Sequence, residues 1–416
     1  MLWSGKHLQS QLGPQYNIIS FDPRGVQNSG IWLTCFPRLK MSTKPHKRYS
    51  EPESYEKGKA LGRSCARTNS DSHLRYVGTV ANVHDMAHFL ALNHAQKGRE
   101  NSDDGKLWYF GISYGTVIGH TFASLFPEKV GRMVLAGNID SMAWYAGADP
   151  ESASDTDKAV MSFFTSCFDA GPANCAFYGN STSPEDMVRR YQAILDRLRD
   201  APSNGQLSRI KLTFIRTLYD PPTLFASLAR QLRYLEHQGV AQPYAKRGTP
   251  LRRINYYNLY ATPLIRAVDV DGNSPAKTYA QFRAVQEAYQ EKSPSMGSIF
   301  AYNDLPFTAA FDKKMQPPSQ HFAGFDPAGA KTHNPILFVN ALRDPVTPIA
   351  SARKMSALFP GSEVLAVNVT GHGSRMDESS CVGEYIRAYL EEGVLPAPEM
   401  ACQPDGPSIL WNETTW

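Results

Sequence analysis

The sequence predicts an α/β protein with a mostly parallel sheet flanked by helices and with a largely helical insertion. Two observations support this. Short apolar runs that end at Gly, Asp or Asn alternate with amphipathic helical patterns. The alternation stops between residues 141 and 330, where helical patterns follow one another. Hydrophobic residues make up 42% and charged residues 20% of the 416 residues, which is enough apolar material for a large core and excludes a disordered chain.

Five brief runs rich in β-branched or aromatic residues are expected to form buried parallel strands. They cover residues 16–22, 107–110, 132–136, 335–340 and 363–369. Apolar side chains at helical spacing predict helices between these runs, within residues 83–90, 349–359 and 385–390.

The interval 141–330 is interpreted as a helical lid inserted between the two halves of one core domain, residues 1–140 and 331–416. Ser-Pro-Glu-Asp at 183–186 is typical of a helix start, with an N-cap residue, proline at the first position and acids in the first turn. Apolar residues then recur at helical spacing at Met187, Tyr191, Ile194, Leu195 and Leu198. Residues 222–236 and 276–290 also have helical patterns.

A G-x-S-x-G motif, Gly-Ile-Ser-Tyr-Gly, occupies residues 111–115. Chance alone gives about 0.15 such motifs in a chain of this length, so the motif needs its context. A predicted strand precedes it and a helix with small residues follows it, which is the setting of a nucleophile elbow. Such an elbow exposes the Ser113 hydroxyl where the helix dipole and the backbone amide of Tyr114 stabilise negative charge. The alternative is an ordinary serine in a Gly-rich turn.

Two residues near the ends of later predicted strands are candidates to activate Ser113, because a serine hydroxyl needs a base. Asp344 follows the run 335–340, and His372 follows the run 363–369 between two glycines. Asp344 precedes a proline and also suits a turn, and a lone histidine is commonly structural. The order Ser, Asp, His, with each residue at a strand end, nevertheless favours the catalytic triad of an α/β-hydrolase.

Other function classes are disfavoured by the sequence. The net charge of +4 is too small and too evenly spread to indicate nucleic acid as the main partner. The apolar stretches stop well short of the roughly 18 residues of a membrane span. His84, His88 and His94 share one predicted helix but lack the glutamate of a metalloprotease signature, so no metal site is expected. A nucleotide enzyme is unlikely because no Gly-rich phosphate loop follows the first predicted strand.

Five stretches form a joint pattern that is more specific than the motif alone. They are Phe-Asp-Pro-Arg-Gly-Val at 21–26, Tyr-Phe-Gly-Ile-Ser-Tyr-Gly-Thr at 109–116, Phe-Pro-Glu-Lys-Val-Gly-Arg-Met-Val-Leu at 126–135, Asp-Pro-Val-Thr-Pro at 344–348 and Gly-His-Gly at 371–373. Together they resemble the secreted tripeptidyl aminopeptidase and proline iminopeptidase-like branch of the α/β-hydrolases. The resemblance runs from about residue 15 to about residue 402, and the last third resembles the C-terminal segment typical of that branch.

The resemblance implies Ser113 as nucleophile, Asp344 as orienting acid and His372 as general base of an acyl-enzyme route. It also implies release of short peptides from free N-termini, with the lid restricting the substrate. No metal or organic cofactor is implied, and the chain is expected to be a monomer that acts on a peptide or a small ester. Two alternatives remain: a carboxylic-ester hydrolase on the same triad, and a catalytically impaired or non-catalytic scaffold.

The N-terminal region departs from the pattern of that branch. Members normally begin with a signal peptide, further strands and a Gly-Gly-Pro-Gly-type loop that supplies the second oxyanion amide. The first residues here contain no apolar run of a signal peptide, and Lys6–Leu12 is helix-like. The expectation is an N-terminally incomplete form whose sheet lacks the strand between those carrying Asp22 and Ser113. Loss of one oxyanion donor costs about 3–4 kcal/mol in the barrier.

The six cysteines permit 15 pairings. Cys167 and Cys175 enclose a turn-rich loop, and Cys381 and Cys402 bracket a predicted helix. The nearest-neighbour set, which the resemblance also implies, pairs Cys35 with Cys65, Cys167 with Cys175 and Cys381 with Cys402. Six buried free thiols in a cytosolic protein are the alternative.

The cysteine pattern and the resemblance together favour an extracellular protein, although no signal peptide is evident. Asn180 and Asn412 begin Asn-X-Thr sequences and are candidate glycosylation sites. Asn368 has the same form but lies in a predicted core strand, so its modification is not expected.

Overall fold

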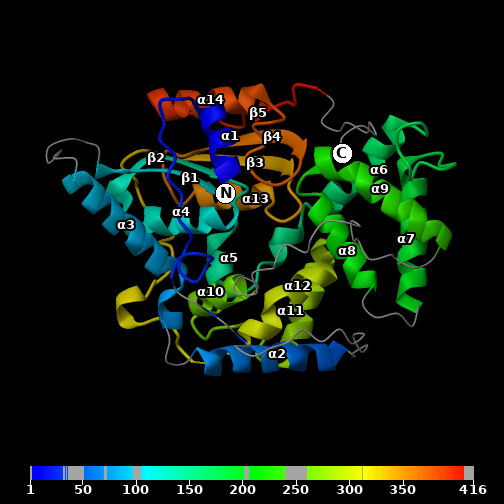
Figure 1. Ribbon diagram of the computed structural model, residues 1–416, viewed down its shortest axis with the longest axis horizontal. Helices are drawn as coiled ribbons and strands as arrows, with labels where there is room; N and C mark the ends of the chain where they lie inside the picture. Colours follow the sequence, from blue (N-terminus) through cyan, green and yellow to red (C-terminus); the bar gives the residue numbers. More distant parts are fainter. Residues whose placement is uncertain are drawn as a thin grey trace.

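A parallel sheet lies between two layers of helices in the upper part of the view in Figure 1. The computed structural model describes residues 2–30, 33, 35, 51–69, 73–96, 105–200, 206–238, 260–311 and 313–406. Within these ranges the sheet has five strands in the order β1-β2-β3-β4-β5, and all neighbours are parallel. The strands are β1 Leu107–Ile112, β2 Val130–Ala136, β3 Leu337–Arg343, β4 Glu363–Thr370 and β5 Ala401–Cys402. The predicted parallel α/β fold is confirmed.

Four of the five predicted strands are present, as β1 to β4, but the strand predicted at 16–22 is wrong. These residues belong to no sheet. Ile19 is 68% exposed and Phe21 is 46% exposed, so the apolar run is not buried between neighbours. A strand is stabilised by a hydrogen-bonded partner and by packing, and this segment has no strand pairing in the described chain. No predicted strand corresponds to the short strand β5.

Helices cover both faces of the sheet (Figure 1). On one face lie α1 Leu2–Leu12 and α14 Ser380–Glu392, and on the other lie α3 Thr79–Gln96, α4 Tyr114–Leu125 and α13 Ile349–Ser356. Alternate residues of a strand point to opposite faces. Val134 therefore packs in the hydrophobic cluster between the sheet and helices α1 and α14. Leu135 packs in the cluster on the opposite face, between the sheet and helices α3, α4 and α13.

A largely helical segment separates β2 from β3. Its helices are α5 Ser141–Ala146, α6 Thr156–Ala170, α7 Pro184–Asp200, α8 Gln206–Thr217, α9 Pro221–Gln238, α10 Ala261–Val270, α11 Tyr279–Lys292 and α12 Gly297–Thr308. This segment also contains the short 3-10 helices η4 Pro150–Ala153 and η6 Pro318–Gln320, and two others, η1 His73–Tyr76 and η3 Pro127–Lys129, precede β2. The helix predicted after Ser183 is α7: the Ser183 hydroxyl accepts a hydrogen bond from the Asp186 amide at 3.2 Å. All five apolar positions predicted for this helix are buried.

The helix α2, Glu51–Thr68, packs against the insertion, beneath α11 and α12 (Figure 1). The Tyr55 hydroxyl donates a hydrogen bond to the carbonyl of Ala276 at 2.8 Å. Gly58 lies against Pro306 and Gly62 lies against the backbone of Phe307, so the two helices approach where α2 has no side chain. Residues 141–330 thus contact α2 as well as the sheet layer, and the division into core and lid remains a prediction.

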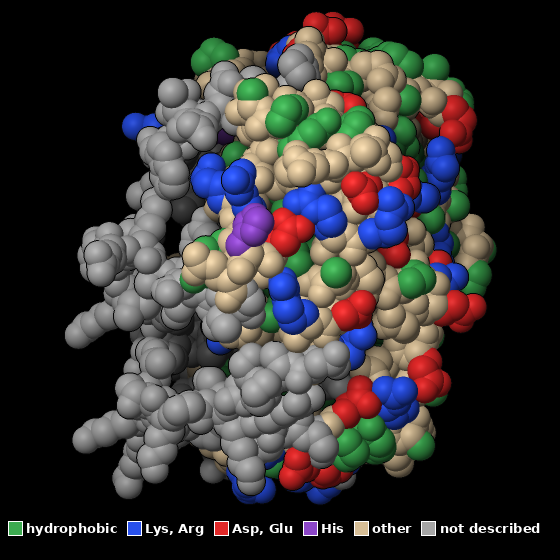
Figure 2. All heavy atoms as spheres, turned by 90° about the vertical axis from the view of Figure 1, so that its right-hand side faces the viewer, with side chains coloured by type: hydrophobic (Ala, Val, Ile, Leu, Met, Phe, Trp, Pro, Cys, Tyr) green, Lys and Arg blue, Asp and Glu red, His purple; other side chains and the backbone are tan. Residues whose placement is uncertain are grey.

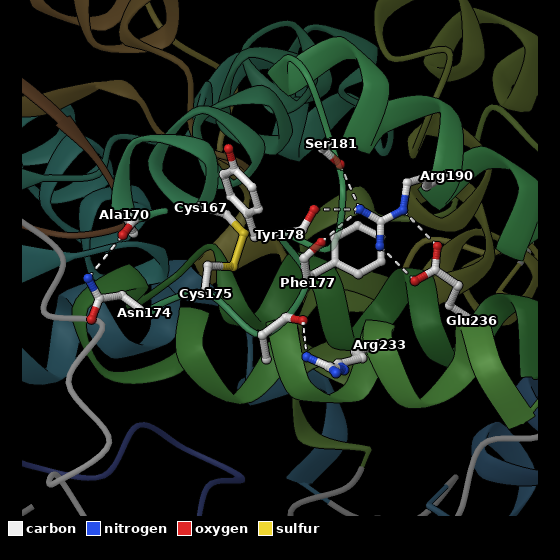
Figure 3. Close-up of a disulfide and its surroundings, with 11 residues drawn as sticks. Cys167, Ala170, Asn174, Cys175, Phe177, Tyr178, Ser181, Arg190, Arg233 and Glu236 are labelled. Atoms are coloured by element: carbon white, nitrogen blue, oxygen red, sulfur yellow. Dashed lines mark hydrogen bonds and ion pairs between the residues drawn. A yellow bond between two sulfur atoms is a disulfide. The ribbon is translucent and has the colours of Figure 1, made fainter. Parts of the chain in front are cut away.

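Three disulfides join Cys35 to Cys65, Cys167 to Cys175 and Cys381 to Cys402. These are the nearest-neighbour pairs of the sequence. The Cys167–Cys175 bond closes the loop after α6, and Arg190 of α7 holds the segment that follows Cys175 (Figure 3). Arg190 donates to the carbonyls of Phe177 and Tyr178 at 3.0 and 2.8 Å and pairs with Glu236 of α9 at 2.7 Å.

The surface at the α6–α9 end carries charges of both signs. Figure 2 shows Lys and Arg side chains lying next to Asp and Glu side chains on this face, without an extended region of one sign. Across the described ranges, no helix has both the length and the apolar character that crossing a membrane requires.

Candidate active site

Ser113 occupies a strained turn between β1 and α4. Its φ of 56° and ψ of −119° lie outside the regions that L-residues ordinarily adopt. The turn requires glycine nearby, because a Cβ on Gly111 would lie 2.6 Å from the Tyr109 ring and 2.7 Å from the carbonyl of Gly115. The Ser113 amide donates to the carbonyl of Ala136 at the end of β2, at 3.1 Å. The spacing of the G-x-S-x-G motif therefore follows from close backbone packing.

Tyr114 is the first residue of α4, so its backbone amide is among those without a partner inside the helix. Its side chain is fixed by a buried network. The Tyr114 hydroxyl lies 2.9 Å from the hydroxyl of Thr79. The Thr79 hydroxyl in turn donates to the carboxylate of Asp269 in α10 at 2.6 Å. Asp269 also accepts from the indole nitrogen of Trp144 at 2.9 Å. Burial raises the pKa of Asp269 to about 6 and that of Tyr114 well above its ordinary value.

Asp344 follows β3 and is fully buried. One carboxylate oxygen accepts hydrogen bonds from the amides of Val346 and Thr347, at 3.0 and 2.9 Å. The other lies 2.8 Å from Nδ1 of His372. The sequence allows two roles for Asp344, a turn residue and the partner of a histidine. In the structure each role belongs to one of its two carboxylate oxygens.

His372 follows β4, and its side chain is 7% exposed. Besides Asp344, the hydroxyl of Thr347 lies 3.1 Å from Nδ1. Gly137 makes room for the ring, since a Cβ there would lie 3.0 Å from Cε1. The other ring nitrogen, Nε2, is buried and has no hydrogen-bond partner in the described part of the chain. One nitrogen is thus held by the acid, and the other is available to accept a proton.

The loop that carries His372 lies beside the Ser113 turn. A Cβ on Gly373 would lie 3.6 Å from Cγ2 of Ile112, the residue that precedes Ser113. β1, β3 and β4 run parallel, so the residues that follow them gather at one edge of the sheet. The three candidate residues therefore share this edge, although Ser113 is more than 200 residues from Asp344 and His372 in the chain.

Two contributors to the site have no sequence signature. The carbonyl of Tyr219, between α8 and α9, accepts from the His372 amide at 3.2 Å, and the two rings meet at 4.8 Å. Arg375 donates to the same carbonyl at 3.2 Å. No local pattern predicts a contact between an insertion turn and a distant loop. The role of Gly137 had a weak signal, namely a glycine directly after a predicted strand.

The remaining candidate residues lie elsewhere. Asn180 is exposed in the turn after the Cys167–Cys175 loop. The Asn368 side chain is bound to Arg343 at 3.0 Å and to Gln403 at 2.8 Å. Asn412 lies outside the described residues. Among the described residues, no three His, Cys, Asp or Glu side chains form a group that could hold a metal ion.

The chain is similar to known enzymes over most of its length. Residues 314–402, which include Asp344 and His372, match the family model described as TAP-like protein. The chain is 27% identical to serine protease Hip1 of Mycobacterium tuberculosis, over 95% of this chain and 76% of the relative. It is 25% identical to tripeptidyl aminopeptidase of Streptomyces lividans, over 94% and 71% of the two chains. It is 24% identical to carboxylesterase B of Mycobacterium tuberculosis, over 94% and 74%.

These similarities extend over most of the chain, and they agree with the parallel sheet and the flanking helices. The resemblance to the tripeptidyl aminopeptidase branch is therefore confirmed, and the chain is a serine hydrolase with the α/β-hydrolase fold.

Proposed function

We propose that the protein is a serine peptidase that releases short peptides from free N-termini, with Ser113, His372 and Asp344 as its catalytic residues. One observation carries the proposal. The imidazole of His372 is 2.8 Å from a fully buried Asp344, on a loop that packs beside the strained Ser113 turn. The names of the relatives Hip1 and tripeptidyl aminopeptidase support peptide bonds as the substrate.

The geometry supports a double-displacement mechanism. Oγ of Ser113 attacks the scissile carbonyl carbon while Nε2 of His372 accepts its proton, and Asp344 stabilises the imidazolium. The amide of Tyr114 and the dipole of α4 stabilise the oxyanion. The imidazolium then protonates the leaving amine as the C–N bond breaks. Water, deprotonated by the same nitrogen, hydrolyses the acyl-enzyme and regenerates Ser113.

The helical insertion is proposed to limit the substrate to chains with a free N-terminus. Its α8–α9 turn contacts the His372 loop, so substrate that reaches Ser113 passes close to the insertion. No metal or organic cofactor takes part in the proposed reaction, and a monomer suffices because all three catalytic residues come from one chain.

A carboxylic-ester hydrolase is the second candidate, and the similarity to carboxylesterase B favours it. The same triad serves both reactions, so the difference lies in the need for a substrate amine. A peptidase of this kind requires the free amine, whereas an esterase hydrolyses simple acyl esters without one.

An extracellular location is part of the proposal. Three disulfides are stable in an oxidising compartment and are rare in the cytosol. Asn180 is exposed and available as a glycosylation acceptor, whereas the bonded Asn368 in β4 is not expected to be modified.

The test compares a tripeptide aminomethylcoumarin with its N-acetylated form, using the wild type and the Ser113→Ala variant. The proposal predicts release of the fluorophore from the free tripeptide, at least 100-fold slower release from the acetylated one, and none with Ser113→Ala. Ser162→Ala in α6 is the matched control, because among the described residues that hydroxyl bonds only the carbonyl of Ala159 and should not affect the rate. Equal rates on both peptides, with faster cleavage of p-nitrophenyl butyrate, would instead establish the esterase.

A further inference from the structure

The turn between α8 and α9 contacts the candidate general base directly. The backbone amide of His372 donates to the carbonyl of Tyr219 at 3.2 Å. The Tyr219 ring also meets the imidazole edge to face, with centroids 4.8 Å apart and planes at 65°. Both contacts come from the insertion and neither involves Asp344 or Ser113. The imidazole therefore has a neighbour beyond those of the proposed triad.

Arg375 fixes this turn to the loop that carries His372. Its Nη1 donates to the same Tyr219 carbonyl at 3.2 Å, and its Nη2 lies 3.9 Å from the carboxylate of Asp220. The guanidinium also forms an ion pair with Glu378, whose side chain is 7% exposed. The Arg375 side chain itself is 11% exposed. One arginine thus joins the insertion turn to its own loop.

The backbone of the loop is shaped for this arrangement. Arg375 has a φ of 55°, in the left-handed region that favours glycine. Gly371 has a φ of 147°, and a Cβ there would lie 2.9 Å from the Arg375 guanidinium carbon. The arginine therefore folds back over the residue that precedes His372. A strained non-glycine residue persists where the surrounding contacts require it.

The imidazole is contacted from two sides. From the sheet side, Asp344 and Thr347 lie at Nδ1 and Gly137 lies at Cε1. From the insertion, the Tyr219 ring lies against the imidazole. A single hydrogen-bonded nitrogen leaves the ring free to tilt about that bond, and Tyr219 supplies a contact on the ring that opposes such a tilt. The direction of Nε2 toward a serine depends on this tilt.

We propose that Tyr219 is a positioning residue for His372, and that Arg375 holds Tyr219 in place through its carbonyl. The inference rests on the proposed function, because it assigns His372 as the base. It makes the insertion part of the catalytic apparatus: the α8–α9 turn sets the orientation of the imidazole from outside the sheet domain.

The first experiment measures kcat and KM on the substrate that the wild type hydrolyses: a tripeptide aminomethylcoumarin if it is a peptidase, or p-nitrophenyl acetate if it is an esterase. Tyr219→Ala should lower kcat about tenfold or more while KM stays within about twofold, because orientation and not binding is lost. Tyr219→Phe keeps the ring and should restore kcat to within about threefold of the wild type. Tyr219 is 39% exposed, so its removal leaves no enclosed cavity. Tyr178→Ala is the matched control, since that ring stacks on Phe168 in the same insertion and should leave kcat unchanged.

The second experiment removes the arginine without leaving a buried carboxylate alone. The double variant Arg375→Gly and Glu378→Gln loses the guanidinium and the charge it neutralises, and glycine accepts the left-handed backbone. It should lower kcat as Tyr219→Ala does while its melting temperature remains close to that of the wild type. Arg353→Gln, at an exposed arginine paired with Glu399, is the control and should keep wild-type kcat.

The outcomes separate the two claims. If His372→Ala abolishes hydrolysis but Tyr219→Ala keeps the wild-type kcat, the positioning role is wrong and the proposed function stands. If Tyr219→Phe is as slow as Tyr219→Ala, the hydroxyl and not the ring matters, and the role is again wrong. If His372→Ala retains the wild-type kcat, the proposed function itself fails. A loss in Tyr219→Ala that Tyr219→Phe restores supports the inference.

Discussion

The two carboxylate oxygens of Asp344 make different hydrogen bonds. One holds the amides of Val346 and Thr347, and the other holds Nδ1 of His372. A change at this residue can therefore affect local folding, catalysis or both. The choice of substitution separates the two effects, because asparagine retains one carbonyl-type oxygen and loses the charge.

Asp344→Asn should lower kcat by roughly 10⁴-fold, since an amide neither stabilises the imidazolium nor selects the correct tautomer. Its remaining oxygen can still accept from the turn, so the melting temperature should change little. Asp344→Ala leaves two amides unpaired and should be destabilised further, by about 1–3 kcal/mol. Kinetics and thermal unfolding of both variants check this. A kcat of Asp344→Asn within tenfold of the wild type would show that Asp344 is only a turn residue.

The helix α4 is aligned by contacts at its first turn. Thr79 at the start of α3 connects the Tyr114 hydroxyl to Asp269 of α10, and Trp144 of α5 donates to the same carboxylate. Four elements thus meet next to Ser113. Because Asp269 is buried, its hydrogen bonds have few replacements from solvent.

Thr79→Val keeps the shape of the side chain and removes the connecting hydroxyl. It should reduce the free energy of unfolding by about 1–3 kcal/mol, because Tyr114 and Asp269 each lose a buried partner. Urea unfolding measures this. Thr217→Val in α8 is the control: within the part of the chain that the structure describes, that hydroxyl bonds only a carbonyl of its own helix, at 2.8 Å, so a much smaller loss is expected. Equal losses in both variants would contradict a special role for the network.

The elements that the sequence predicts well are those with local signals. β1 to β4 are apolar runs that end at turn-forming residues, and Ser113, Asp344 and His372 follow three of them. The run 16–22 has the same local pattern, but strand formation depends on a partner that a local pattern does not specify. Tyr219 and Arg375 escape prediction for a similar reason, because their contact joins an insertion turn to a loop more than 150 residues away.

At the scale of the whole molecule, buried carboxylates make stability depend on pH. Asp149, in the insertion, is 7% exposed. Burial, with Asp140 as a nearby negative charge, raises its pKa to about 7. The folded protein therefore binds this proton more tightly than the unfolded chain does. The stabilisation is fully present below about pH 4, the pKa in the unfolded chain, and is lost as the pH rises through about 7. The raised pKa of Asp269, about 6, acts in the same direction.

Between pH 5 and pH 8 the titration of Asp149 should lower the free energy of unfolding by on the order of 2–3 kcal/mol. Asp149→Asn keeps an oxygen that can accept from the Ser152 amide, now at 3.2 Å, and removes the titration. The variant should therefore lose less stability than the wild type over this pH interval. Denaturant unfolding at both pH values measures the difference. An identical loss in the two proteins would show that Asp149 does not titrate in this range.

The proposed function depends on Ser113 being a nucleophile that His372 activates. Labelling the purified protein with a fluorescent fluorophosphonate, followed by mapping of the modified peptide by mass spectrometry, tests this dependence. We expect one modified residue, Ser113, with labelling abolished by Ser113→Ala and strongly slowed by His372→Ala. A well-folded protein that remains unlabelled, or that is labelled at another serine, would contradict it.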